Sequence, residues 1–220
     1  QYYDNKVLND NENNSVVLSN KLIYIFITYQ KNRHKLKELL EEIDHFLKRI
    51  ISNLDVQARL DFWYYTKILG YGDKYKPSNK FINGVLNLLK STDINPDNAV
   101  LFYIYIRSLM ECDSKYNYLT KYFNNLMNIS KQDKILYGYY LTHIILYDLK
   151  FSHQSFNKLS NKENSNFAIK ELTKLCSNKD KLIITDPDLL GEILFCFKLC
   201  NVNNNNLYLQ IYNILSMLIT

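Results

Sequence analysis

Apolar residues recur at helical spacing along most of the chain. Between positions 36 and 50 they return at intervals of three and four, which predicts a helix with one apolar stripe. The run 22–29 is apolar and rich in β-branched residues, so helix and strand stay open as alternatives there. Residues 1–20 are polar and rich in Asn, and they predict a loosely held N-terminal arm before a single domain over 21–220.

Residues that cap helices precede four of the apolar runs. Proline follows two of these caps at the first helical position, and the four caps are Asp55, Asn95, Asp133 and Asp186. Ser130 stands three residues before Asp133 and predicts a variant of the capping box. Ser78 is expected to open a helix that runs to about Lys90. The stretches between predict further helices near 117–129, 165–177 and 206–219.

The four starts form an internal repeat. They are separated by 40, 38 and 53 residues, and each begins an apolar helix that is followed by a more amphipathic one. A helix-pair repeat of this length predicts an all-α fold of stacked antiparallel hairpins, forming an incomplete α/α toroid or a short α-solenoid. The first helix of each pair is expected in an inner layer and the second in an outer layer. The longer third repeat holds a polar insertion, Lys158 to Ser165, which predicts a surface loop.

Composition excludes several classes of protein. The chain has 220 residues, of which 47% are hydrophobic, with only 5 Gly and 3 Pro, and this argues against disorder and Gly/Pro-punctuated β-sandwiches. The net charge of +5 comes from scattered residues, which argues against a nucleic-acid partner. Because no apolar run reaches about 18 residues, we expect no membrane partner and a cytoplasmic location. The four cysteines are interpreted as free thiols, buried in the case of Cys196 and Cys200, and no cofactor or metal site is expected.

Polar residues on the apolar inner helices are the candidate functional residues. Asp61 and Glu192 both lie six positions after their helix starts, so the repeat predicts two carboxylates at equivalent heights. Such a pair could act as acid and base or bind a cation. The alternative is that each carboxylate faces solvent or pairs with a neighbour such as Arg59.

His143 lies within the otherwise apolar stretch 139–147. It could serve as a general base or a ligand, or it could be a hydrogen-bonded histidine of the core. Three aromatic residues of the inner helices are predicted to contribute to a binding surface: Trp63, Tyr139 and Tyr140. The sequence shows none of the common catalytic or phosphate-binding motifs.

Two segments resemble an uncharacterised bacterial domain family of α/α-toroid type. Leu141–Phe151 is similar to a Leu-Thr-His stretch followed by apolar residues and Phe-Tyr, and Asp188–Phe197 is similar to an Asp-Leu run that contains Glu-Leu-Leu. The family's Thr-Asp-Phe-Gly portion is replaced here by residues 148–152. The resemblance implies a toroid fold, singles out His143 and Glu192, and implies a role in binding or tailoring peptides, because relatives accompany peptide natural-product genes.

Two functional hypotheses follow. The first is a binding or accessory protein whose concave surface holds a peptide or a protein partner. The second is an enzyme with a central cavity, acting on a peptide or glycan through His143 with Asp61 and Glu192. The enzyme hypothesis requires these three side chains to converge within about hydrogen-bonding or one-water distance.

Overall fold

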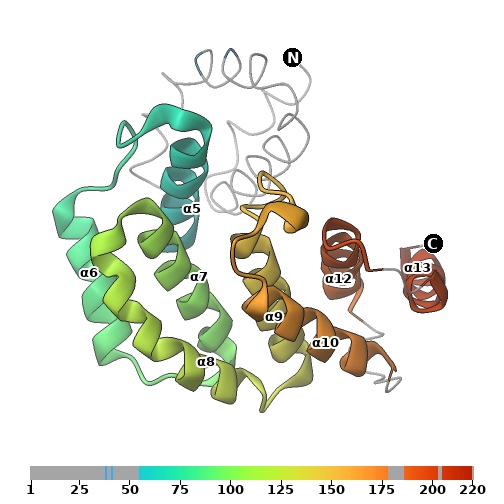
Figure 1. Cartoon of the computed structure of the whole chain (residues 1–220). Helices are drawn as coiled ribbons and strands as arrows, with labels where there is room; N and C mark the ends of the chain where they lie inside the picture. Colours follow the sequence, from blue (N-terminus) through green and yellow to red (C-terminus); the bar gives the residue numbers. More distant parts are fainter. Residues whose placement is uncertain (1–37, 39–40, 42–54, 178–185, 203–204, 220) are drawn as a thin grey trace. The chain divides into compact units, whose positions relative to one another are not determined.

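The fold was analysed in a computed structural model, which describes residues 38, 41, 55–177, 186–202 and 205–219. Every regular element in these ranges is a helix, which confirms the all-α prediction for this part of the chain (Figure 1). The arm at 1–20, the run 22–29 and the helix at 36–50 lie outside the described residues, apart from two positions of the last.

The chain divides into two compact units. The first contains the described residues up to Thr92 together with Tyr105–Tyr118, and the second contains Asp93–Ile104 and the described residues from Leu119 onward. Helix α7 (Pro96–Cys112) therefore gives its first half to the second unit and its last half to the first. The single domain over 21–220 stays a prediction.

The first unit is built from α5 (Val56–Thr66), a π-helix (Lys67–Tyr71), α6 (Asn79–Ser91) and the end of α7. Asp55 caps α5, and its carboxylate accepts a hydrogen bond from the backbone N–H of Ala58 at 2.7 Å. Ser78 caps α6 in the same way through the N–H of Phe81 at 3.3 Å. Both caps confirm the predicted helix starts.

The second unit contains the start of α7, α8 (Phe123–Ser130), α9 (Lys134–Asp148), α10 (Glu163–Ser177), α12 (Pro187–Leu199) and α13 (Asn205–Ile219). Helix α9 contacts α8, α10 and α12, while α13 contacts α12 and α10. The carboxylates of Asp133 and Asp186 cap α9 and α12, as predicted. The helices expected near 165–177 and 206–219 are confirmed as α10 and α13.

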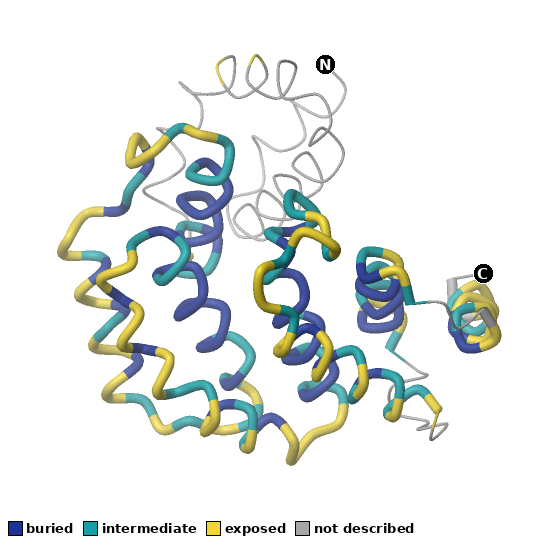
Figure 2. Tube along the Cα trace, in the orientation of Figure 1, coloured by how far each residue is buried: buried dark blue, intermediate teal, exposed yellow. Residues whose placement is uncertain are grey.

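Burial differs between the helices that begin a predicted pair and those that follow them. On α9 the buried residues cover most of the helix circumference: Tyr137, Gly138, Tyr140, Leu141, Thr142, Ile144, Ile145, Leu146 and Tyr147 (Figure 2). On α10 only Ser165, Ala168 and Leu172 are buried, at the spacing of a single stripe. The first helix of this pair is therefore more deeply buried than the second, and the arrangement of stacked hairpins in a toroid or solenoid stays a prediction.

The segment 117–129 is not one α-helix, which corrects the prediction. Residues Ser114–Tyr122 form a 3-10 helix, and the α-helix begins only at Phe123. Tyr116 and Leu119 are the buried residues of this 3-10 segment. Side chains three residues apart lie on one face of a 3-10 helix, which is the spacing of these two buried residues.

Two smaller predictions about caps and loops were also wrong. Ser130 does not cap α9, because it is the last residue of α8 and its hydroxyl donates to the carbonyl of Met127 at 2.8 Å. The insertion Lys158 to Ser165 is not a loop throughout, since α10 already begins at Glu163. Ser165 is buried, and its hydroxyl donates to Asp148 at 2.9 Å.

Candidate functional site

The candidate site of the second unit lies where α9 and α12 pack against each other. Gly138 on α9 stands directly against Leu189 on α12, and a Cβ atom added at Gly138 would lie only 2.8 Å from a Leu189 methyl carbon. The missing side chain therefore allows a close approach of the two helices. This approach brings polar residues of the following turns of α9 within reach of α12.

His143 and Glu192 meet at this junction. His143 Nδ1 lies 3.9 Å from Glu192 Oε2, and the side chains are 15% and 27% exposed. Thr142 Oγ1 lies only 2.6 Å from the same carboxylate oxygen and 2.9 Å from the carbonyl of Tyr139. The two predicted residues are thus neighbours, joined by a threonine that the sequence analysis did not single out.

The protonation state of Glu192 decides which group donates and which accepts in these hydrogen bonds. Burial raises the pKa of Glu192, against the opposing effects of His143 and of the hydrogen bond from Thr142. A hydroxyl has one proton, so Thr142 donates either to the carboxylate or to the Tyr139 carbonyl. When Glu192 is protonated, it can donate to Thr142 Oγ1 while Thr142 donates to the carbonyl, and every proton then has an acceptor.

Tyr139 extends the cluster toward the start of α12. Its hydroxyl lies 2.9 Å from Asp188 and 3.2 Å from Asp186, whose other role is to cap the helix. Burial, followed by the hydrogen bond to Asp188, raises the pKa of Tyr139, so the phenol stays a donor. The Tyr139 carbonyl lies 2.8 Å from Nδ1 of His143, which leaves the imidazole Nε2 as the nitrogen that can act on another group.

Asp61, the third predicted acid–base residue, belongs to the other unit. It lies on α5 and is only 4% exposed. Burial, followed by the negative charges of Asp55 and Asp61, raises the pKa of Tyr105 to about 12. The pairing of Asp61 with His143 and Glu192 stays a prediction.

Trp63 and Tyr140, two of the three predicted binding aromatics, are in the core. Trp63 is fully buried on α5, and Tyr140 is 2% exposed and donates its hydroxyl proton to the carbonyl of Phe123. Their predicted binding roles stay predictions. Tyr139 is the half-buried member of the three.

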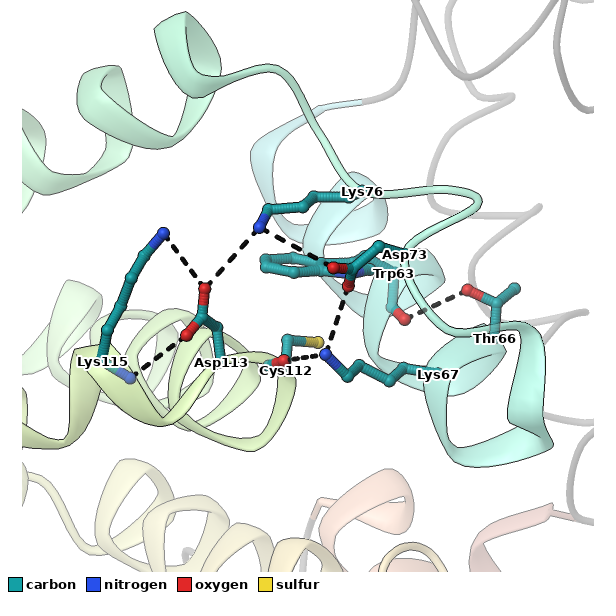
Figure 3. A network of polar contacts seen from close by, with 8 residues as sticks. All are labelled: Trp63, Thr66, Lys67, Asp73, Lys76, Cys112, Asp113 and Lys115. Atoms are coloured by element: carbon teal, nitrogen blue, oxygen red, sulfur yellow. Dashed lines mark hydrogen bonds and ion pairs between the residues drawn. The ribbon is translucent and has the colours of Figure 1, made fainter.

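A polar network surrounds Trp63 in the first unit. Lys67 lies at the start of the π-helix and donates to the carbonyl of Cys112 and to Asp73 (Figure 3). The hydrogen bond from Lys67 holds the pKa of Asp73 below its usual value. Lys76 bridges Asp73 and Asp113 at 4.0 and 3.6 Å. The network joins the segment that follows α5 to the end of α7.

A hollow that the sequence analysis missed lies between α5 and α6. It has a volume of about 490 Å³, and its lining residues are Val56, Arg59, Ser78, Lys80, Phe81, Gly84, Val85 and Leu88. Leu88 is 38% exposed, whereas Val85 is buried. The signal available in the sequence was Gly84, a glycine inside an otherwise good helix.

The four cysteines are free, and Cys196 and Cys200 are buried, as predicted. Burial raises the pKa of Cys196 well above its usual value, which favours the thiol over the reactive thiolate. Among the described residues, no three His, Cys, Asp or Glu side chains are grouped as a metal ion would require. No helix in the described ranges combines the length and the apolar character needed to cross a membrane.

Comparison of the chain with protein-family models, curated proteins and solved structures gave no match.

Proposed function

We propose that the chain is a helical-repeat binding protein that holds a peptide, or a segment of a protein partner, in the groove between α5 and α6. The observation that carries the proposal is the hollow of about 490 Å³ with an apolar floor. Ligand sites are concave and mainly apolar, with a few polar groups that fix orientation. This groove has both properties.

Three apolar side chains that line the groove lie in a row along α6, and a bound extended or helical segment would lie over them. Phe81, Val85 and Leu88 follow one another at helical spacing along α6. A recognised segment would bury the part of Leu88 that is exposed in the free protein. Burying apolar surface in this way contributes roughly 25 cal/mol per Å² before the costs of association.

The proposal includes the arrangement predicted from the repeat. We propose stacked hairpins in an incomplete α/α toroid or a short α-solenoid, acting in the cytoplasm as an accessory protein of peptide processing. The buried first helices and the half-buried second helices support stacking. Nucleic acid is not proposed as a partner, because the positive residues are scattered along the chain.

Selection from a random peptide library displayed on phage tests the binding proposal. The immobilised full chain is the bait, and selected peptides are then measured against two variants, Gly84→Leu and Gly191→Leu. A Cβ at either glycine meets no atom within 4 Å, so the first atom of each leucine side chain has room, and circular dichroism checks that both variants fold. Only Gly84 lines the groove. Peptides that bind the chain and Gly191→Leu but not Gly84→Leu support the proposal, whereas peptides that bind all three proteins contradict it.

The alternative function is an enzyme that uses His143 and Glu192 as an acid–base pair. The observation that favours it is the 3.9 Å separation between Nδ1 of His143 and Oε2 of Glu192, with both side chains reachable by solvent. A carboxyl group whose pKa is raised by burial, standing beside an imidazole, is suited to exchange protons with a bound substrate. Asp61 is kept as the third predicted member.

Hydrolysis assays with peptide and glycan libraries test the alternative. The variants are His143→Gln and Glu192→Gln, and folding is checked by circular dichroism. Turnover that falls at least about 100-fold in both folded variants supports an acid–base role. Turnover that neither variant changes excludes it.

A further inference from the structure

The charges at the α5–α6 groove are all of one sign. The lining residues include Arg59 and Lys80 and no carboxylate. Ser78, which also lines the groove, caps the start of α6, so the positive end of that helix dipole lies at the same place. Two cations and a helix N-terminus therefore act together on whatever occupies the hollow.

Arg59 is held in place by an aromatic ring. The carbon of its guanidinium lies 4.5 Å from the centre of the Phe81 ring. Its Nε–H is buried and has no hydrogen-bond acceptor among the residues that the structure describes. A planar guanidinium stacked on an aromatic ring is suited to a carboxylate, because a guanidinium can donate two parallel hydrogen bonds.

The apolar half of the groove adjoins these charges. Gly84 leaves open space where any other residue would place a side chain. Val85 and Leu88 border this space. The groove thus offers an apolar pocket on one side and a positive field on the other.

We infer that the groove recognises an acidic amphipathic peptide segment, with an apolar side chain over Gly84 and an Asp or Glu carboxylate on Arg59 and Lys80. This inference rests on the proposed binding function and adds the charge of the ligand. Charge complementarity distinguishes partners more strongly than it adds affinity. Acidic segments are therefore selected over basic segments that have the same apolar residues.

Two synthetic amphipathic peptides test the inference by fluorescence anisotropy with the full chain. They share the same Leu and Phe positions and carry either Glu or Lys at every polar position. The Glu peptide is expected to bind at least about tenfold more tightly, which corresponds to about 1.4 kcal/mol. Its affinity is expected to fall as salt is added.

Variants that reverse or remove a positive charge locate the effect. Lys80→Glu is expected to remove most of the preference, and Arg59→Gln to weaken it. Lys80 is exposed, so its variant keeps the test valid if Arg59→Gln fails to fold. Lys90→Glu makes the same charge change on α6 at an exposed residue that does not line the groove, and is expected to keep the preference.

The outcomes separate the two proposals. Equal binding of both peptides, lost in Gly84→Leu, overturns the acidic preference and leaves the binding function standing. Binding that Gly84→Leu does not weaken overturns both. Absence of binding by either peptide overturns the acidic preference, and the library selection then decides the binding function. Self-association in sedimentation, lost in Gly84→Leu, assigns the groove to a second copy of the chain and overturns the inference.

Discussion

Gly138 and Leu189 set the distance between α9 and α12. A Cβ at Gly138 would lie 2.8 Å from one Leu189 methyl carbon and 3.1 Å from the other, and Leu189 is fully buried. The leucine therefore cannot turn away without displacing its own neighbours. This contact holds the helices at the separation at which Glu192 meets His143.

Gly138→Ala is expected to destabilise the protein in spite of the better helix propensity of alanine. The overlap with Leu189 destabilises the folded protein by about 1–3 kcal/mol. The higher helix propensity of alanine stabilises it by at most about 1 kcal/mol. Gly191→Ala is the matched control on α12, since no atom lies within 4 Å of its added Cβ. Gly191→Ala is expected to raise the free energy of unfolding by about 0.5–1 kcal/mol. Urea unfolding of the two variants checks the difference, and equal stabilisation by both would contradict the close approach.

Glu192 is expected to make stability fall as pH rises. Burial raises the pKa of Glu192 in the folded protein above its usual value of about 4.5. The folded state therefore keeps its proton to higher pH than the unfolded chain, and the free energy of unfolding decreases from about pH 4.5 up to the folded pKa. Below that window both states are protonated and this carboxyl contributes no pH dependence.

Glu192→Gln is expected to remove this decrease, so that its stability relative to the unmodified protein grows as pH rises. Urea unfolding at a series of pH values measures the effect. Glu163→Gln, which removes an exposed carboxylate in the first turn of α10, is the control for the loss of one negative charge. If the difference between Glu192→Gln and the unmodified protein is constant across the window, Glu192 is not held protonated.

Lys150 occupies a backbone position that favours glycine. It follows the last turn of α9 with φ +48°, and its N–H donates to the carbonyl of Tyr147, while Phe151 donates to Leu146. This is the Schellman motif, whose left-handed residue is usually glycine. Asn201 takes the same role after α12 with φ +54°.

Lys150→Gly is expected to raise the free energy of unfolding by about 1 kcal/mol, because it removes left-handed strain. Lys198→Gly, in the last turn of α12, is expected to lower it by about 0.5–1 kcal/mol. Thermal and urea unfolding would show the opposite signs. Destabilisation by both changes would mean that the Lys150 side chain itself contributes more than its backbone strain costs.

Helix starts could be predicted from the sequence because caps are local. Asp55, Asp133 and Asp186 each bind N–H groups two or three residues ahead, so their spacing reports the helix start directly. The 3-10 helix at 114–122 could not be predicted in this way. Tyr116 and Leu119 are its buried residues, and burial is a tertiary property that local sequence does not report.

The residues of the candidate sites also divide into those that the sequence marks and those that only the structure reveals. His143 and Glu192 stood out as polar residues on apolar helices, and the structure brings them together. Thr142 did not stand out, because a threonine in a helix becomes informative only when its partner is known. The groove at Arg59 and Gly84 could not be predicted, because it requires α5 and α6 to lie side by side.

Lys67 is expected to contribute to stability by joining two helix ends. It donates to the carbonyl of Cys112, at the end of α7, and to Asp73 at 3.2 Å. Lys67→Met keeps the length of the side chain and removes the donor, so the carbonyl loses a charged partner. A loss of about 1–2 kcal/mol is expected, since the site is partly exposed. Lys90→Met, at an exposed position in the last turn of α6, is expected to change stability by less than about 0.5 kcal/mol. Equal losses in the two variants, measured by urea unfolding, would show that the contact with Cys112 contributes nothing.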